Sequence, residues 1–539
     1  MKKYYFLGFL LLILKLNSQI FVTQSGAGNK SGSSWANAAT LQNAIANYTS
    51  GDQLWLRKGT YNITQTLEIG YNQAGIKIYG GFAGNETALN QRDYVANVTI
   101  LDGLNQRKII DLEADNVLFD GLTFTKGFVT GDNDGGAAIF IWASATTIKN
   151  CTFRANNSEG SRGAGALYVR IGDNHLIENC LFENNKQVSK QYPMGSNGGG
   201  AIHVWTDNVV IKNSTFKNNQ AGDFGGAIYT WGENLIVQQC TFENNHSDSL
   251  GGAIHVNYYD VKVSNSIFKT NSANSRGGAI NNNHIAYVTN SLFDGNTTTE
   301  IGGAIYNQNE LYMTNSTLVN NNNTAIAHST NESSTNVKYV THIFNSIFYN
   351  NTSTLPRLKD VDKEDDGTDE STKDFRRNIF QENTYGANNL VGINPQFQNF
   401  ANGNFKTVRN SPGHNFGNAA LYNNVSLVTA ANSQDLAGKP RLFNNLIDLG
   451  AYEIQETLLG TVENENKDFS IYPNPVIDEM HITKVSSDAT YSIVNLNGQQ
   501  IAEGKVVNNQ LDLRTLEKGV YIITIEDKGE IINHKFIKK

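Results

Sequence analysis

Cysteine and proline are scarce in this chain: its 539 residues include three cysteines and seven prolines. So few cysteines, in odd number, exclude a small fold that is held together by many disulfides. Basic residues are too few to indicate a nucleic-acid partner, because 42 Lys and Arg stand against 50 Asp and Glu, with a pI near 5.7. No apolar run reaches the roughly 18 residues that a membrane-spanning helix needs, so we expect no transmembrane segment in the mature protein.

The N-terminus has the pattern of a signal peptide. Lys2 and Lys3 precede an apolar run from Tyr4 to Leu14 that is too short to cross a bilayer. We therefore predict that residues 1–18 are a signal peptide and that the mature protein is exported through the inner membrane.

Glycine and asparagine, in contrast, recur in two short phrases that keep a common step of 26, 26 and 25 residues from Phe216 onward. A fixed period in this range indicates stacked supersecondary units. The first phrase is Gly-Gly-Ala-Ile, whose copies begin at Gly199, Gly225, Gly251, Gly277 and Gly302. The second is Phe-x-x-Asn, and its phenylalanines are Phe153, Phe182, Phe216, Phe242, Phe268 and Phe293.

These repeats predict an all-β protein built as a right-handed, single-stranded parallel β-helix. Between the phrases the sequence alternates apolar and polar residues over a few positions, as strands do, and has no helical periodicity. Because equivalent residues stack on one another in such a solenoid, we expect the phenylalanines to form an interior column and the asparagines a turn ladder in left-handed backbone. The paired glycines would give backbone freedom at the corner before the next strand.

The cysteines fit the same repeat. Cys151, Cys180 and Cys240 each lie two residues before the repeated phenylalanine, where the other coils have serine. We therefore predict small inward-facing fillers that stay unpaired.

The predicted β-helix covers residues 19–455. Thr40 is a suitable N-cap for a helix over residues 41–48, which would cover the open N-terminal end of the solenoid. From about residue 50 to residue 455 we expect about fifteen coils. An acidic segment at residues 359–370 interrupts them; its spacing of acids around Gly367 makes calcium the one cofactor to consider, but Lys373 stands where the bidentate Glu of a calcium loop is expected.

A polar linker at residues 456–467 separates a second domain, residues 468–539, in which short alternating strands predict a small β-sandwich. The runs Ile471–Val476, Tyr491–Gly498 and Lys518–Tyr521 resemble the C-terminal sorting domain of the type IX secretion system of Bacteroidetes. The resemblance implies that the secretion machinery is a partner, that the protein crosses the outer membrane, and that it is released or attached at the cell surface.

The β-helical part has two further resemblances. Its paired phrases are similar to the repeats of chlamydial polymorphic outer membrane proteins, which are adhesins. Its cap helix and its ending resemble exported β-helix proteins of the pectate-lyase-like class, which contains polysaccharide lyases and hydrolases. A fold alone does not choose among such functions.

The strand that contains the end of Gly-Gly-Ala-Ile has outward-facing positions at which we expect a binding site. Alternation predicts a first outward column of Phe140, Tyr168, His203, Tyr229, His255, Asn281 and Tyr306, and a second outward column of Trp142, Arg170, Trp205, Trp231, Asn257, Asn283 and Gln308. A solvent-facing strip of Trp, Tyr and His with polar neighbours such as Glu233 is what a sugar-binding groove needs. The structural alternative is that loops cover the strip or that its rings stack on one another.

The sequence therefore predicts a secreted or cell-surface protein that binds extracellular polysaccharide or cell-surface glycan, with depolymerisation as an open extension. For catalysis, Arg170 would neutralise a uronate while His203, Tyr229 or His255 exchanges protons. Trp142, Tyr168, Trp205, Trp231, Glu233 and Tyr306 would bind the sugar. No pair of carboxylates stands out as a glycosidase site, and the alternative is a surface adhesin that binds host or matrix components without catalysis.

Overall fold

The structure is a computed structural model that describes residues 19–131, 135–188, 197–328, 339–354, 359–361, 372–382, 386, 388–426, 428–455, 470–496, 498–527 and 530–539. The predicted signal peptide, the predicted linker and most of the acidic segment lie outside the described residues. The chain folds into two units, Met1–Ile454 and Gln455–Lys539.

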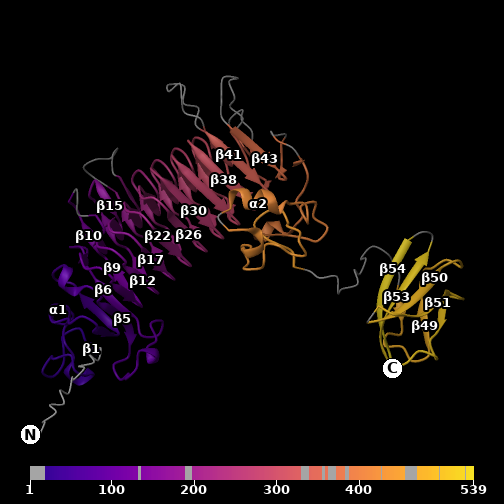
Figure 1. The fold of residues 1–539 in the computed structure, drawn as a ribbon, viewed down its shortest axis with the longest axis horizontal. Helices are drawn as coiled ribbons and strands as arrows, with labels where there is room; N and C mark the ends of the chain where they lie inside the picture. The colour runs from indigo at the N-terminus through magenta and orange to yellow at the C-terminus, as the bar shows by residue number, and fades with distance from the viewer. Residues whose placement is uncertain are drawn as a thin grey trace, which may run out of the picture. The chain divides into compact units, whose positions relative to one another are not determined.

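The first unit is a parallel β-solenoid, drawn in Figure 1 as a stack of short strands. One coil contains β21 (Ile202–Val204), β22 (Val209–Lys212), β23 (Thr215–Lys217) and β24 (Gln220–Ala221). The next coil repeats these strands 26 residues later in parallel register, so that Phe216 lies beside Phe242. The predicted parallel β-helix is confirmed.

Among the described residues, equivalent strands of successive coils form four long parallel sheets and a short one of β15 (Arg162–Ala164) and β20 (Asn197–Gly199). Sheet A contains β1 (Gln19–Val22), β2 (Gln53–Arg57), β5 (Lys77–Phe82), β8 (Leu118–Asp120), β12 (Thr147–Lys149), β17 (His175–Glu178), β22, β26 (Leu235–Gln238), β30 (Asp260–Ser264), β34 (Ile285–Thr289), β38 (Glu310–Thr314), β41 (Val340–Phe344) and β43 (Thr372–Arg376). Sheet C contains β4 (Leu67–Ile69), β7 (Ile110–Leu112), β11 (Ile139–Trp142), β16 (Leu167–Ile171), β21, β25 (Ile228–Thr230), β29 (Ile254–Val256), β33 (Ile280–Asn282), β37 (Ile305–Asn307) and β40 (Ile326–His328). Sheet B runs from β3 (Gly59–Asn62) to β45 (Leu390–Val391), and sheet D from β10 (Phe128–Val129) to β36 (Thr297–Thr298).

The repeated phenylalanines form the predicted interior column. Seven rings from Phe124 to Phe293 are fully buried, and neighbouring rings stack nearly parallel with centroids 4.7–4.8 Å apart. The spacing equals the distance between paired strands, about 4.7–4.9 Å, so the column and the sheets share one register.

The repeated asparagines form a buried ladder from Asn156 to Asn351. In each step the side-chain Nδ2 donates to Oδ1 of the next asparagine at 2.9–3.1 Å. Nδ2 of Asn219 also donates to the carbonyl of Phe182 at 2.9 Å, so this side chain bonds both the preceding coil and the following coil.

The left-handed residue at this corner is not the ladder asparagine, and that part of the prediction is wrong. Positive φ belongs to the residue before it, for example Asn218 at 54° and Asn244 at 54°. The left-handed backbone of Asn218 turns the chain, so that the side chain of the following Asn219 points inward. The side chain of Asn218 itself faces solvent.

A second row of left-handed residues lies at the corner between sheets A and B, one in each coil. We call it the corner amide row, and its members are Asn150, Asn179, Asn213, Gln239, Asn265, Asn290, Asn315 and Asn345. Each precedes the position that alternates between cysteine and serine. Cys151, Cys180 and Cys240 are buried and free, as predicted, and burial raises the pKa of Cys240 to about 12.

The N-terminal end of the solenoid carries the predicted helix. It is α1 (Leu41–Ala46), capped by Thr40, whose hydroxyl accepts a hydrogen bond from the Asn43 amide at 3.3 Å. Leu41, Ala44 and Ile45 are buried in the core cluster of the solenoid, which is how an amphipathic helix shields an open end.

The C-terminal end differs from the prediction of about fifteen coils that continue to residue 455. Coil strands end at β45, and a hairpin of β46 (Phe397–Asn399) and β47 (Asn404–Thr407) follows. Residues 411–426 and 428–454, here called the C-terminal strap, then lie on the outside of the coils with α2 (Ala419–Val425), seen beside β38 in Figure 1. Leu421 and Val425 of α2 pack on Phe344 of β41.

The second unit has two antiparallel sheets. One contains β48 (Ile471–Tyr472), β49 (Glu479–Ile482) and β52 (Gln510–Asp512), and the other contains β50 (Thr490–Asn495), β51 (Gln500–Lys505), β53 (Gly519–Asp527) and β54 (Glu530–Lys538). Val476, Met480, Ile493 and Phe536 are among the side chains of its separate core. This arrangement agrees with the predicted small β domain.

The asparagine ladder predicts that substitutions at the neighbouring positions Asn219 and Asn218 change the stability of the protein by very different amounts. Asn219→Ala leaves amide groups of Asn185 and the Phe182 carbonyl without their buried partner, so we expect a loss of about 2–4 kcal/mol in the free energy of unfolding. The control Asn218→Gly keeps the left-handed backbone at an exposed position and should change stability by less than about 0.5 kcal/mol. Urea denaturation followed by circular dichroism measures both, and equal midpoints for the two variants would contradict the ladder's role.

Candidate functional site

The first outward column is in the predicted register but is not solvent-facing. Sheet C pairs Tyr168 with His203, His203 with Tyr229 and Tyr229 with His255. The exposed fractions of Tyr168, His203, Tyr229, His255 and Tyr306 are 3% or less. The prediction that these five side chains line an open groove is wrong.

The cover is a row of residues that stand directly before each Gly-Gly-Ala-Ile: Phe224, Leu250, Arg276 and Ile301, joined by parallel bridges. Phe224 stacks on Tyr229 and on His255, with centroids 5.7 and 4.8 Å apart. The Arg276 guanidinium donates to the Tyr306 hydroxyl at 3.1 Å. Gly225 (φ 61°) turns the chain at this point, which folds the preceding residue over the column.

Burial makes these side chains poor acids and bases. Burial, with a further contribution from Arg170, lowers the pKa of His203 to about 3, and burial lowers the pKa of His255 to about 3. Burial also raises the pKa of the Tyr229 phenol. At neutral pH both imidazoles are uncharged, and their side chains are too deeply buried to touch a substrate.

The second outward column is partly exposed, but its rings stack on one another. Trp205 and Trp231 are parallel with centroids 4.9 Å apart, and Tyr258 continues the stack at 5.3 Å. The Arg170 guanidinium covers the other face of Trp205, 4.4 Å from the ring centroid. Because these ring faces are occupied, mainly ring edges are left for a ligand.

Two further predicted residues lie apart from this stack. Trp142 is exposed, but a register shift pairs it with Ile171 instead of Arg170. Glu233 is exposed at the turn after Trp231, and its backbone amide donates to Asp207 at 2.7 Å. Tyr258 and Tyr259 are exposed but were not among the predicted site residues. Two adjacent tyrosines in a turn are the signal in the sequence that could have indicated them.

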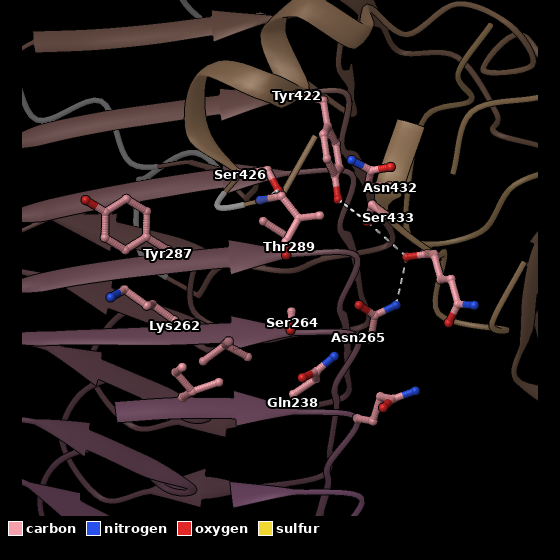
Figure 2. Close-up of a pocket in the computed structure, with 15 residues that line it drawn as sticks. Gln238, Lys262, Ser264, Asn265, Tyr287, Thr289, Tyr422, Ser426, Asn432 and Ser433 are labelled. Atoms are coloured by element: carbon pink, nitrogen blue, oxygen red, sulfur yellow. Dashed lines mark hydrogen bonds between the residues drawn. The ribbon is translucent and has the colours of Figure 1, made fainter. Parts of the chain in front are cut away.

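A groove of about 380 Å³ lies elsewhere, between the outer face of sheet A and the C-terminal strap. Figure 2 shows Tyr287, Lys262 and Gln238 on the strands and Tyr422 and Ser433 on the strap. The lining residues are Ile236, Gln238, Gln239, Lys262, Val263, Ser264, Asn265, Tyr287, Thr289, Tyr422, Ser426, Val428, Asn432, Ser433 and Gln434. This groove could not be predicted from the sequence, because the strap that forms one wall belongs to no repeat.

The corner amide row holds the strap in place and so builds the groove. Nδ2 of Asn265 donates to the carbonyls of Gln434 and Asp435 at 2.9 and 2.7 Å. Nδ2 of Asn290 donates to the Tyr422 hydroxyl at 2.9 Å and to the Gln434 carbonyl at 2.9 Å. Side chains of the coils thus take the place of main-chain pairing for a segment that has no strand partner.

The chemistry of the groove is that of a neutral polar binding site. Amide and hydroxyl side chains supply donors and acceptors, and none of the described lining residues is acidic. Tyr287 stacks on Tyr312 with centroids 5.1 Å apart. Lys262 is the one cationic residue of the described lining, and its Nζ lies 3.0 Å from an Asp260 oxygen. A few directed polar groups beside aromatic surface are typical of a small-ligand site.

Within the described part of the chain, no group of three or more His, Cys, Asp or Glu side chains is placed to hold a metal ion. Most of the acidic segment considered for calcium is outside the described residues. Its Asp360 is described and is buried at the end of the asparagine ladder, where its carboxylate accepts from Asn351 at 3.2 Å and from the Gln381 side chain at 2.8 Å.

Family models match both units of the chain. The right handed beta helix region matches residues 85–258 and 137–309, and the secretion system C-terminal sorting domain matches residues 470–539. The chain carries a right-handed β-helix and a type IX sorting domain. The sorting domain supports secretion and a cell-surface location for this β-helix protein. No helix among the described residues has the length and apolarity to cross a membrane.

Individual proteins match less closely. The metabotropic glutamate receptor-like protein R of Dictyostelium discoideum is 30% identical over 166 residues, which are 30% of this chain and 9% of that protein. The solved pectate lyase Pel9A has a TM-score of 0.44 at 13% identity, covering 81% of this chain and 96% of its own. A rhamnogalacturonan lyase has a TM-score of 0.42 at 14% identity, covering 71% and 91%.

The buried histidines predict that this β-helix protein loses stability in acid. Their folded pKa values, about 3 for His203 and His255, lie below the ordinary value of 6.5. Between these values the unfolded chain binds protons that the folded chain does not, so stability falls as the pH drops from about 6.5 toward 3. His203→Phe keeps a ring stacked between Tyr168 and Tyr229 but cannot be protonated, and should flatten the curve of Tm against pH. An unchanged curve in this variant would contradict the assignment.

Proposed function

We propose that this secreted β-helix protein binds an extracellular polysaccharide in the groove between sheet A and the C-terminal strap. The observation that carries the proposal is the lining itself: a cavity of about 380 Å³ with amides, hydroxyls and Tyr287, and with no acidic group among its described residues. Sugars present many hydroxyls and apolar ring faces, which such donors, acceptors and tyrosines bind.

The groove supports binding better than the aromatic strip of sheet C. In the first outward column His203 and His255 are buried, and in the second column the faces of Trp205 and Trp231 are occupied by neighbouring rings. The strip therefore contributes to the stability of the coils. The proposal includes no role for Arg170, His203, Tyr229 or His255 in proton transfer, because three of them are inaccessible and Arg170 lies over Trp205.

The proposal also includes the domain plan and the route of export. A signal peptide over residues 1–18 leads the chain through the inner membrane, the β-helix of residues 19–455 binds the glycan, and residues 468–539 engage the type IX machinery. The sorting domain thereby delivers the groove to the outside of the cell, where polysaccharide is present.

The test compares the groove with the aromatic strip. Tyr287→Ala and Gln238→Ala should each weaken binding to polysaccharide about three- to tenfold, because each removes a contact worth about 1 kcal/mol. Tyr258→Ala, an exposed tyrosine of the strip, serves as the matched control and should bind like the unaltered protein. Retardation in gels that contain polygalacturonate, alginate, xylan or laminarin measures binding.

The outcomes separate the alternatives. Loss of binding in Tyr258→Ala but not in Tyr287→Ala would place the site on the strip and overturn the groove. Failure to bind every polysaccharide while binding cells or matrix protein would favour the adhesin. Release of unsaturated uronates or of new reducing ends would reveal depolymerisation, an activity that the groove's described lining does not explain.

A further inference from the structure

We infer that the polysaccharide continues out of the groove along the outer face of sheet A toward the N-terminus, parallel to the axis of the coils, with one sugar unit per coil. The exposed amides of Gln239 and Asn213, which belong to the corner amide row, hold it. This inference rests on the proposed function and adds the orientation and length of the bound chain.

The first observation is how the same row binds the strap. In the C-terminal coils Nδ2 of Asn315 donates to the Asp448 carbonyl at 2.7 Å, and Nδ2 of Asn345 donates to the Asn418 carbonyl at 3.0 Å. Nδ2 of Asn265, the member of the row nearest the N-terminus that bonds the strap, donates to the carbonyls of Gln434 and Asp435. The row is therefore a series of donors, one per coil, that recognises acceptor oxygens lying outside the solenoid.

The second observation is that the row continues beyond the strap. Gln239 borders the groove, and Asn213 follows in the next coil toward the N-terminus. Both side chains are exposed, and within the described part of the chain neither side-chain amide has a hydrogen-bond partner. Their left-handed backbone, with φ of 53° and 51°, gives them the same outward direction as Asn265 at 49°.

The third observation is an apolar row beside these amides. Leu176, Val210 and Ile236 lie side by side on β17, β22 and β26, each partly exposed on the outer face. Between this row and the amides, Lys212 and Glu178 form an ion pair of 3.0 Å. An apolar strip with donors along one edge matches a sugar chain, whose ring faces are apolar and whose edges carry hydroxyls.

The spacing favours a polysaccharide over a peptide. Coils repeat about every 4.8 Å, which is close to the length of one sugar ring in an extended chain. In an extended peptide, residues that face the same way recur at about 6.6 Å and would lose register with the coils after a few residues. A peptide that crosses sheet A would also find the strand amides already paired within the sheet.

The experiment measures how affinity depends on chain length. Using the full chain and calorimetry, alginate and laminarin fragments from disaccharide to hexasaccharide are compared. Affinity should rise with each added unit until the coils that carry Gln239 and Asn213 are covered. The double variant Asn213→Gly/Gln239→Gly keeps the left-handed backbone and should weaken hexasaccharide binding about tenfold while leaving disaccharide binding within about twofold. Asn218→Gly, at the opposite end of the sheet B strand and facing solvent, is the control.

The results distinguish failure of the extended path from failure of the groove. Affinity that is independent of length, or an equal effect of Asn218→Gly, overturns the extended path. If Tyr287→Ala still weakens binding about three- to tenfold in that case, the groove and the proposed function stand. If neither alginate nor laminarin nor their fragments bind the full chain, while xylan or polygalacturonate does, the same series is run with xylo- or galacturonate oligosaccharides under the same criteria; no binding to any of the four overturns both proposals.

Discussion

The buried ladder of asparagine amides is the interaction on which the rest of this solenoid depends. Each ladder side chain donates to the next coil and to a main-chain carbonyl, as Asn219 does with Asn245 and Phe182. A shift of one residue between coils would leave several buried amide groups unpaired, at a cost of about 1–3 kcal/mol each. The ladder therefore keeps a single register, and the phenylalanine column stacks because that register is kept.

The same register governs the outside of the coils. Any residue type that the repeat places in one outward position is brought against its own equivalent about 4.8 Å away. For aromatic residues the result is face-to-face stacking, as between Trp205 and Trp231. Stacking between equivalent rings thus covers the ring faces that a ligand would otherwise contact. A binding surface is therefore expected where the repeat ends, or where a non-repeating segment lies on the coils.

The C-terminal strap is such a segment. It has no strand partner in the coils, and it is held by side chains such as Asn265 and Asn345. Beyond the strap, toward the N-terminus, the corner amide row continues with Gln239 and Asn213, which, among the described residues, make no hydrogen bond to the strap. One row of amides is therefore a structural anchor in the C-terminal half of the solenoid and, in the proposed path of the polysaccharide, a ligand contact in the other half. The sorting domain is a separate unit with its own core, so it and the proposed binding groove lie in different parts of the chain.

The sequence by itself determined the solenoid, its cap helix, its phenylalanine and asparagine columns, its unpaired cysteines and its sorting domain. The features of the solenoid follow from local propensity and from a repeat that brings equivalent residues together wherever the coils lie, whereas the sorting domain follows from the resemblance of its motifs to a known domain. Only the tertiary structure decided that Phe224 and Arg276 fold over His255 and Tyr306, and that the last coils give way to a strap. The physical reason is that periodicity gives the direction of a side chain relative to its own strand, whereas exposure depends on segments elsewhere in the chain that obey no period.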